Sequence, residues 1–206
     1  MNELQVELKN SVKRFCLDKI EPHMEHDDAN SNIRMEIFSQ LGQLGLTGIT
    51  LPEEYGGAGL GYQDLCVVLE EIAKYSVSYS VTVSVSTMVQ SILSEFGNEE
   101  QKKKYLPSLT SGEEIGAFCL SESHSGSDAA SLKTTAKKVE GGYKLNGSKM
   151  WITSGGIAKT YIVMARTGVS GPKGVSAFIL RDGAEGFSYG KKEVKMGWKI
   201  SPTREL

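Results

Sequence analysis

The chain has 206 residues, of which 39% are hydrophobic and 23% are charged, a composition typical of a globular protein with a substantial core. Its formal net charge of −2 gives no electrostatic reason to expect a nucleic acid or an anionic membrane as partner. The three cysteines, Cys16, Cys66 and Cys119, are far apart, which argues against a disulfide framework or a zinc site; we expect each to be a small buried thiol. No targeting or lipidation pattern opens the chain, so we expect a cytoplasmic protein, or a mitochondrial matrix protein in a eukaryote.

The first half of the chain predicts helices. Two sets of apolar residues fall at helical spacing: Leu4, Leu8, Val12 and Phe15, and then Ile33, Ile37, Leu41 and Leu44. A glycine-dense loop over residues 51–61 follows, without a complete G-x-G-x-x-G or Walker motif, and a helix over 63–74 comes after it. Asn98 and Gln101 form a capping box for a short helix that we expect to end before Pro107.

The segment from Tyr75 to Ser94 has no charged residue and carries two conflicting patterns. Alternate residues from Val77 to Val85 match the period of a strand, whereas Val81, Val85, Met88, Val89, Ile92 and Phe96 form a helical stripe. The frequent serines make the segment too polar for a membrane span. We therefore predict a helix that is buried inside the protein.

From about Ile115 onward the pattern changes to short strands. Gly141-Gly142 and Asn146-Gly147 are hairpin-type turn signals. Strands are predicted over 161–166, 175–180 and 187–189, and residues 198–206 have the pattern of a further strand. The expected fold class is α+β, with an all-α domain over residues 1–112 and a small antiparallel β-barrel or sheet domain over residues 113–206.

Two stretches of the second half suggest a ligand-binding strand pair. The first runs from Phe118 to Asp128 and changes from apolar residues to hydroxyls and a glycine, so backbone N–H groups and serine hydroxyls can approach a phosphate or a ring. The second is Trp151 to Thr153. On a strand, Trp151 and Thr153 point to the same face and could address one flat ligand together.

Other polar residues have an ordinary reading as well as a functional one. Glu122 is either a polar residue at a strand end or a general base, but a single carboxylate without a visible partner is weak evidence for a base. For His124 an exposed loop position is favoured over a catalytic one. His23 and His26, among acidic neighbours, are more readily explained as a solvated helix end than as a metal site.

The chain resembles the acyl-CoA dehydrogenase family in four motifs that occur in the family's order. The motifs are residues 52–59 with 69–73, residues 97–101 with 105–107 and 111–113, residues 118–128, and residues 146–153. The resemblance spans nearly the whole chain and also favours a helix for the uncharged segment. It implies that residue 206 lies within the family's middle β domain, so that this domain is incomplete here. It also implies that the family's C-terminal helical bundle lies outside these residues. One departure is Ser123-His124, where the family often has proline and a small residue.

The resemblance implies a non-covalently bound FAD. The matching residues are Phe118, Cys119, Leu120, Ser121, Gly126, Ser127, Trp151, Ile152 and Thr153. By this match the Ser121 hydroxyl contacts the pyrimidine end of the flavin, and Ser127 holds the pyrophosphate or lies along the acyl-CoA. Trp151 packs against the flavin and Thr153 hydrogen-bonds near N5. Neutral donors at these positions stabilise a reduced, anionic flavin.

The implied reaction removes the α-proton of an acyl-CoA thioester and transfers the β-hydrogen to FAD N5 as hydride, which leaves a trans-2-enoyl-CoA. The catalytic glutamate of the family belongs to the bundle, so no catalytic base is expected within these residues. An electron-transferring flavoprotein and a homo-oligomer, a tetramer, are the implied partners. The alternatives are a truncated, non-catalytic binding or interaction module that holds flavin, acyl-CoA or a partner, and a related acyl-CoA oxidase or flavin monooxygenase.

Overall fold

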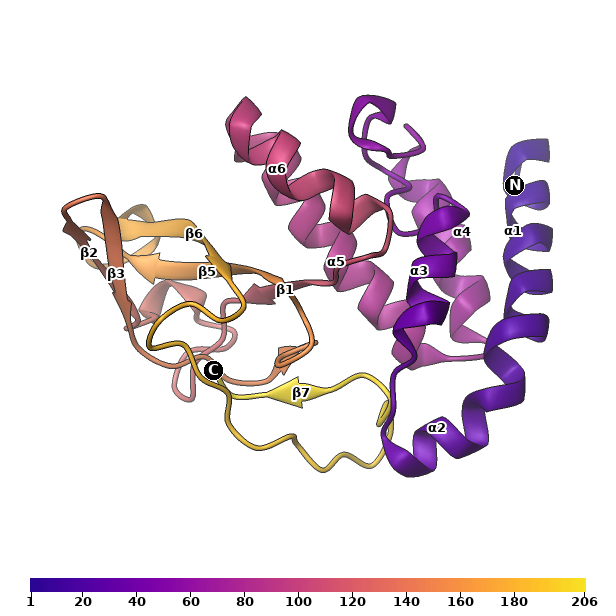
Figure 1. The fold of residues 1–206 in the computed structure, drawn as a ribbon. Coiled ribbons are helices and arrows are strands. Elements are labelled where there is room, and N and C mark those ends of the chain that lie inside the picture. The colour runs from indigo at the N-terminus through magenta and orange to yellow at the C-terminus, as the bar shows by residue number, and fades with distance from the viewer.

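A computed structural model describes all of residues 1–206, as a helical part and a sheet part that lie side by side (Figure 1). The helices are α1 (Glu3–Phe15), α2 (Met24–Asn30), α3 (Met35–Gln43), α4 (Tyr62–Ala73), α5 (Val77–Phe96) and α6 (Glu99–Thr110). The strands are β1 (Gly116–Cys119), β2 (Thr135–Val139), β3 (Gly142–Asn146), β4 (Ile152–Thr153), β5 (Thr160–Arg166), β6 (Val175–Arg181) and β7 (Thr203–Arg204). Helices precede strands along the chain, which confirms the predicted α+β class.

A reciprocal pair of side-chain caps begins α6 and α1. At the start of α6 the Asn98 side chain accepts from the Gln101 backbone N–H at 2.9 Å, and the Gln101 side chain accepts from the Asn98 N–H at 2.9 Å. The predicted capping box is therefore confirmed. Asn2 and Gln5 make the same reciprocal pair at the start of α1. Such a pair satisfies N–H groups that the first helical turn would otherwise leave without partners.

The uncharged segment forms the helix α5, as predicted, and not a strand. Its buried apolar side chains follow the helical period: Tyr79, Val83, Val89 and Leu93. Its buried hydroxyls donate to main-chain carbonyls, for example Ser80 to Leu69 at 2.9 Å and Thr82 to Ser78 at 2.8 Å. No helix of the structure is both long enough and apolar enough to cross a membrane.

The predicted end of α6 before Pro107 is wrong, because the helix continues through this proline to Thr110. Pro107 is exposed, whereas Leu106, Leu109 and Thr110 are buried. The Thr110 hydroxyl also lies 2.7 Å from the Tyr55 carbonyl oxygen, to which it donates. Packing of this last turn outweighs the main-chain hydrogen bond that a proline cannot donate.

The main sheet is mixed and not wholly antiparallel as predicted. β6 pairs antiparallel with β5 along one edge, while β1 pairs parallel with β5 on the other. β2 joins β5 by a single parallel pair and forms a hairpin with β3. β4 and β7 make a separate antiparallel pair. Alternating side chains are common to parallel and antiparallel strands, so the sequence pattern could not distinguish the two.

Two local predictions in the sheet part are wrong. The turn at Gly141-Gly142 joins β2 to β3 as expected, but Asn146-Gly147 leads out of β3 into an irregular segment and forms no hairpin. Residues 187–189 form no strand. Phe187 and Tyr189 instead pack against Tyr161, with ring centroids 5.0 Å and 6.3 Å away from its own. Aromatic packing therefore explains the apolar residues that suggested a strand.

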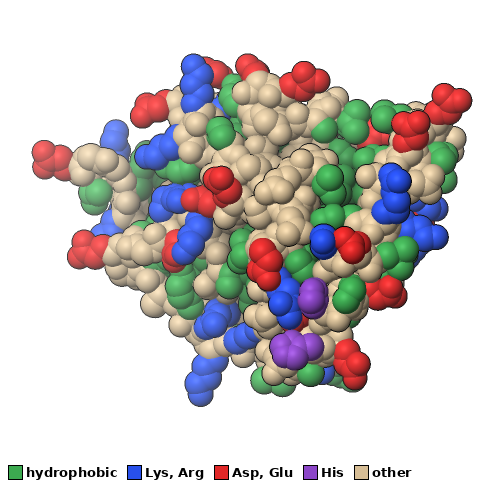
Figure 2. Space-filling view, turned by 45° about the vertical axis from the view of Figure 1, so that its right-hand side comes forward, with side chains coloured by type: hydrophobic (Ala, Val, Ile, Leu, Met, Phe, Trp, Pro, Cys, Tyr) green, Lys and Arg blue, Asp and Glu red, His purple; other side chains and the backbone are tan.

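The apolar core is continuous between the helical and the sheet parts. One cluster of buried side chains includes Val12, Leu41 and Val83 of the helices together with Ala117, Tyr161 and Ile200 of the sheet part. Cys16 and Cys119 are buried in it as predicted, but Cys66 is exposed, which corrects the expectation for that thiol. The face of the molecule in Figure 2 shows charged side chains of both signs interspersed, in keeping with the small net charge.

Candidate functional site

The end of β1 leads into a tight turn that organises the serine-rich loop. The backbone of Glu122 exchanges two hydrogen bonds with that of Ser125, at 2.8 and 3.1 Å. The hydroxyl of buried Ser125 donates to the Asp128 carbonyl at 2.7 Å, so it serves the loop itself. Gly126 and Ser127 face solvent, and a Cβ atom at Gly126 would meet nothing within 4 Å. The outer side of the loop is therefore open to a ligand.

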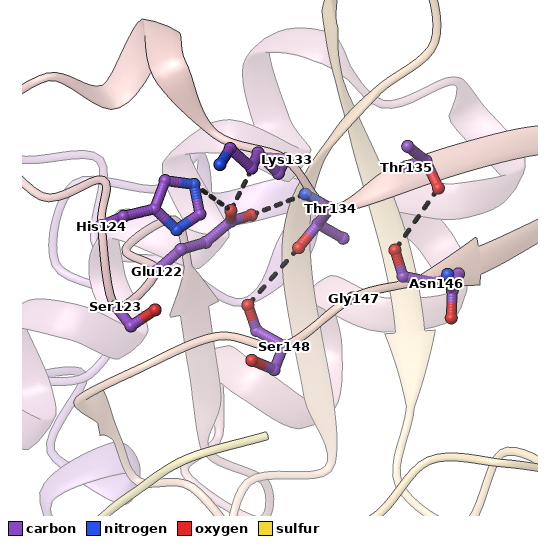
Figure 3. Close-up of a pocket in the computed structure, with 9 residues that line it drawn as sticks. All are labelled: Glu122, Ser123, His124, Lys133, Thr134, Thr135, Asn146, Gly147 and Ser148. Atoms are coloured by element: carbon purple, nitrogen blue, oxygen red, sulfur yellow. Dashed lines mark hydrogen bonds and ion pairs between the residues drawn. The ribbon is translucent and has the colours of Figure 1, made fainter.

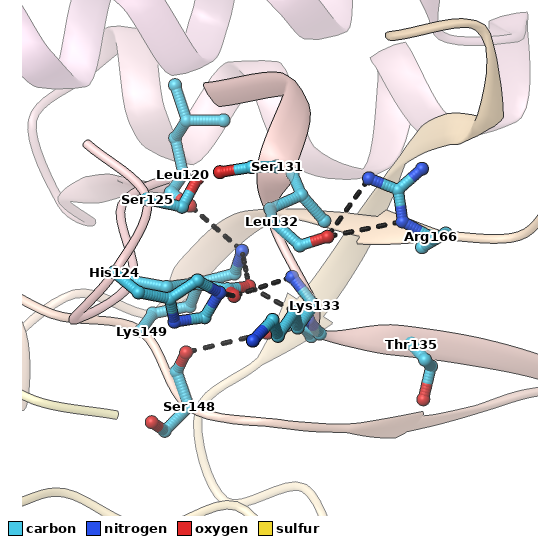
Figure 4. A network of polar contacts seen from close by, with 12 residues as sticks. Leu120, His124, Ser125, Ser131, Leu132, Lys133, Thr135, Ser148, Lys149 and Arg166 are labelled. Atoms are coloured by element: carbon cyan, nitrogen blue, oxygen red, sulfur yellow. Dashed lines mark hydrogen bonds and ion pairs between the residues drawn. The ribbon is translucent and has the colours of Figure 1, made fainter. Parts of the chain in front are cut away.

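The structure brings the two motif stretches of the sheet part together. The Met150 N–H donates to the Ser121 carbonyl at 2.9 Å. One residue earlier, the Lys149 ammonium donates to the Leu120 carbonyl at 2.9 Å and to Glu122 Oε1 at 2.8 Å (Figure 4). Lys149 and Met150 thus donate hydrogen bonds to three consecutive residues of the first stretch, Leu120 to Glu122. These bonds hold Ser121 close to the residue before Trp151, as predicted.

The Glu122 carboxylate is buried and fully paired. Besides Lys149 it accepts from the backbone N–H groups of Lys133, at 2.6 Å, and Thr134, at 2.9 Å. Burial raises its pKa, but the hydrogen bonds from Lys149, Thr134 and Lys133 outweigh this effect and lower the pKa to about 2. A carboxylate with such a pKa and three donors is a poor general base at neutral pH.

His124 is exposed, as predicted, and its Nε2 lies 3.5 Å from Glu122 Oε2. It borders a small polar hollow of about 250 Å³ with Lys133, Thr134 and Ser148 (Figure 3). Nowhere in the chain do three or more His, Cys, Asp or Glu side chains form a group that could hold a metal ion. Near His26, the buried Asp27 carboxylate instead accepts two hydrogen bonds from the Arg34 guanidinium.

Trp151 does not lie on a strand, which corrects the expectation that it shares a strand face with Thr153. Its φ is +57°, in the left-handed region, and β4 begins only at Ile152. Its side chain is 55% exposed, although a large aromatic side chain is normally buried. Thr153 is half-buried and its hydroxyl makes no hydrogen bond within the chain; the same holds for Ser121.

The predicted cofactor-binding residues divide into two groups. Cys119 and Ile152 are buried in the core, and Phe118 and Leu120 are partly buried, so their contribution is mainly to hold the backbone. The remaining residues reach the surface: Ser121, Gly126, Ser127, Trp151 and Thr153. A larger cavity of about 850 Å³ lies under β3, β5 and β6; of these nine residues it contacts only Cys119.

Lys149 is a residue of this site whose role the motifs did not reveal. Glu122 and Lys149 are the only acidic or basic side chains in residues 118–127 and 146–153 respectively, apart from His124. An acidic residue directly after Ser121 and a single basic residue in the second motif are the signal that could have predicted the pair.

Models of two domain families match the chain. The acyl-CoA dehydrogenase N-terminal domain matches residues 2–113 and the acyl-CoA dehydrogenase middle domain matches residues 117–206. The chain belongs to the acyl-CoA dehydrogenase family. Members of this family are flavoproteins, so the site can be tested for its fit to FAD.

Relatives and solved structures agree with this assignment. The chain is 44% identical over 209 residues to a mitochondrial isovaleryl-CoA dehydrogenase of Solanum tuberosum, which covers 100% of this chain and 51% of the relative. It is 45% identical to an acyl-CoA dehydrogenase of Bacillus subtilis, over 98% of this chain and 54% of the relative. The chain thus spans about half the length of the relatives it matches.

Among solved structures, the butyryl-CoA dehydrogenase of Megasphaera elsdenii superposes with a TM-score of 0.92 at 38% identity, over 100% of this chain and 55% of that one. A structure described as an electron transferring flavoprotein of Acidaminococcus fermentans superposes with a TM-score of 0.95 at 39% identity, again over 100% and 55%.

The chemistry of the surface residues fits a flavin. Two neutral hydroxyls, of Ser121 and Thr153, have no partner within the chain, and the exposed Trp151 ring offers a flat apolar face. Glu122, which directly follows Ser121, is already paired and buried, whereas the exposed Asp128 lies at the other end of the loop, beside Ser127. A flavin ring would therefore meet neutral donors and an aromatic face at Ser121, Trp151 and Thr153.

Proposed function

We propose that the chain forms the flavin-facing part of an FAD-dependent acyl-CoA dehydrogenase, which converts an acyl-CoA thioester to a trans-2-enoyl-CoA. The observation that carries this proposal is the junction of the two motif stretches, where the Met150 N–H donates to the Ser121 carbonyl. Around this junction lie the unpartnered hydroxyls and the exposed ring. The family assignment over both halves of the chain supports the same reaction.

Each surface residue has a definite task in this proposal. Bound FAD supplies the acceptor for the hydride that leaves the β-carbon. Ser121 and Thr153 orient the isoalloxazine by neutral hydrogen bonds, and Trp151 covers its edge or face and excludes water. Ser127, exposed beside Gly126, contacts the pyrophosphate or the acyl-CoA.

The α-proton needs a base, and Glu122 is unsuited to the task because its pKa is about 2 and Lys149 occupies it. We therefore assign the base to a carboxylate outside residues 1–206. The relatives' names include isovaleryl-, isobutyryl- and 2-methylacyl-CoA dehydrogenases, so short and branched acyl-CoA thioesters are the substrates to test first. An electron-transferring flavoprotein is the proposed electron acceptor, with a homo-oligomer as the assembly.

The proposal is tested with Trp151→Ala and Thr153→Val in the natural full-length protein. Trp198→Ala is a matched control, because Trp198 is also 55% exposed and has a φ of +56°. We expect Trp151→Ala to weaken FAD binding about 10-fold, since stacking and water exclusion are lost, and Thr153→Val by about 3- to 10-fold for one hydrogen bond. The control should bind FAD as the unsubstituted protein does.

The readouts are the flavin absorbance retained after gel filtration and its bleaching under anaerobic titration with isovaleryl-CoA. Equal losses in Trp151→Ala and Trp198→Ala would show that Trp151 does not face the flavin. A protein that retains no flavin would contradict the dehydrogenase function. Oxygen consumption in place of acceptor reduction would point to an acyl-CoA oxidase.

A further inference from the structure

The Glu122–Lys149 pair is the most deeply buried ion pair of the sheet part. Both side chains are 4% exposed, and Lys149 Nζ lies 2.8 Å from Glu122 Oε1. Lys149 has a second acceptor in the Leu120 carbonyl, and Glu122 has two further donors in the N–H groups of Lys133 and Thr134. Both carboxylate oxygens are therefore hydrogen-bonded inside the protein, and two of the three ammonium N–H groups have acceptors there.

The two backbone donors of Glu122 are themselves held in place. Arg166 donates to the Leu132 carbonyl at 3.2 Å (Figure 4). It also donates to the Ala130 carbonyl at 2.8 Å, and its backbone N–H donates to the Thr134 carbonyl at 2.7 Å. The turn that precedes β2 is thus attached to the end of β5. Glu122 therefore accepts its hydrogen bonds from a turn that Arg166 holds against β5.

The pair encloses Ser121 from both sides. Leu120 and Glu122, its two neighbours, are both bound by the Lys149 ammonium, and Ser121 itself accepts from Met150. On the other stretch, Lys149 also exchanges two backbone hydrogen bonds with Leu206, each of 2.8 Å. The pair therefore adds side-chain hydrogen bonds to the main-chain bond between Ser121 and Met150, beside the core packing of Cys119 and Ile152.

The direction of the Trp151 ring depends on the hydrogen bonds of Lys149 and Met150 more than that of a core side chain would, because core packing does not hold the ring. Its ring is 55% exposed, so its direction is set by its backbone, which lies in the left-handed region at φ +57°. A non-glycine residue keeps such a conformation only when its surroundings impose it. On one side these surroundings are Lys149 and Met150; on the other they are the pairs of β4 with β7.

We propose that the Glu122–Lys149 pair is a positioning device that holds Ser121 and Trp151 at the separation a flavin requires. This inference rests on the proposed function for the identity of the ligand. Neither residue touches the flavin in this arrangement, because both side chains are buried under the surface. A displacement of either stretch by about 1 Å would misplace a hydroxyl or the ring and weaken binding by about 10-fold or more.

The variants are Lys149→Met, which removes the ammonium but keeps most of the side-chain volume, and Lys149→Arg, which restores a cation. The control is Asp27→Asn, which breaks another buried ion pair, with Arg34, in the helical part; Asp27 is 1% exposed. This control lowers the free energy of unfolding by disrupting a buried ion pair, but it leaves the candidate site unchanged. All variants are made in the natural full-length protein.

Two readouts separate positioning from stability. The first is the dissociation constant for FAD at a temperature where all variants are folded; we expect a loss of about 10-fold or more for Lys149→Met, a partial recovery for Lys149→Arg and no loss for Asp27→Asn. The second is the fluorescence anisotropy of Trp151 without flavin, in a background where Trp198 and every tryptophan outside residues 1–206 are replaced by Phe; Trp151 and Trp198 are the two tryptophans within these residues. Lys149→Met should lower this anisotropy, and Asp27→Asn should not.

Unchanged Trp151 anisotropy and FAD affinity in a folded Lys149→Met protein would overturn the inference. So would equal effects in Lys149→Met and Asp27→Asn, which would mean that lost stability explains both. If the unsubstituted protein binds no FAD, the proposed function fails, and the anisotropy alone still decides whether the pair positions Trp151. If Lys149→Met does not fold, Lys149→Arg is the deciding variant, because the guanidinium alters the geometry of the pair. Unchanged FAD affinity and unchanged Trp151 anisotropy in Lys149→Arg would then count against the inference.

Discussion

Glu122 can be identified from the sequence as part of the candidate site, but its role there depends on partners that the sequence does not reveal. Its position in the motif was clear, but Lys149 is 27 residues further along the chain and the donors Lys133 and Thr134 lie in between. Burial raises its pKa, but the hydrogen bonds from Lys149 and from these N–H groups outweigh burial and lower the pKa to about 2. A lowered carboxyl pKa stabilises the folded state above the unfolded value near 4.5, and this stability is lost as pH falls towards 2.

We predict that Glu122→Gln reduces the pH dependence of stability between pH 5 and 2. The unsubstituted protein should lose about 3 kcal/mol of unfolding free energy through this group as Glu122 becomes protonated. The variant should be destabilised at pH 7 by about 3 kcal/mol, because Lys149 is left without its buried counter-charge, and it should lose less on acidification. Urea unfolding at several pH values measures both effects, with Glu140→Gln at the exposed β2–β3 turn as control.

At the scale of elements, α6 shows where a strong local signal yields to packing. A proline inside a helix usually kinks or ends it, yet α6 continues past Pro107, and its last turns place Leu106, Leu109 and Thr110 in the interior. The same competition explains residues 187–189, whose aromatic side chains pack around Tyr161 without forming a strand. The helix α5 and the capping box at Asn98, by contrast, were predicted correctly, although of the predicted apolar stripe of α5 only Val89 is buried and Phe96 is 80% exposed.

We predict that Pro107→Ala stabilises the protein by about 2 kcal/mol. The substitution restores an N–H for the carbonyl one helical turn earlier and removes the clash of the ring, while part of the gain is lost because alanine makes the unfolded chain more flexible. Pro107 is exposed, so no core contact is lost. Thermal and urea unfolding measure the change. Lys103→Ala, on an exposed position of the same helix, should alter stability by less than about 0.5 kcal/mol; a destabilised Pro107→Ala protein would contradict the prediction.

At the scale of the whole molecule, the helical and sheet parts are held together by the contact of α5 with β1. The Gly116 N–H donates to Ser86 Oγ at 3.2 Å, and a Cβ atom at Gly116 would lie 2.8 Å from Val89 Cβ. Glycine is required here because the helix approaches the strand too closely for any side chain. The division at residues 112 and 113 stays a prediction, since the apolar core extends across it.

We predict that Gly116→Ala destabilises the protein by about 1–3 kcal/mol, because the new methyl group forces α5 away from β1. Gly197→Ala is the matched control, as a Cβ atom there would meet nothing within 4 Å. Chemical unfolding should show a loss for the first variant only. Adding Val89→Ala to Gly116→Ala should recover part of the loss, and strictly additive effects of the two substitutions would argue against a direct clash.

The sequence by itself determined the family, the order of helices before strands, the long buried helix and the two stretches that form the candidate site. These features depend on residues close together in the chain: periodicity, caps and short motifs. Only the tertiary structure decided the parallel pairing of β1 with β5, the continuation of α6 through Pro107, the left-handed conformation of Trp151 and the partners of Glu122. Each of these depends on contacts between residues far apart in the chain, whose energies outweigh the local preferences from which a sequence is interpreted.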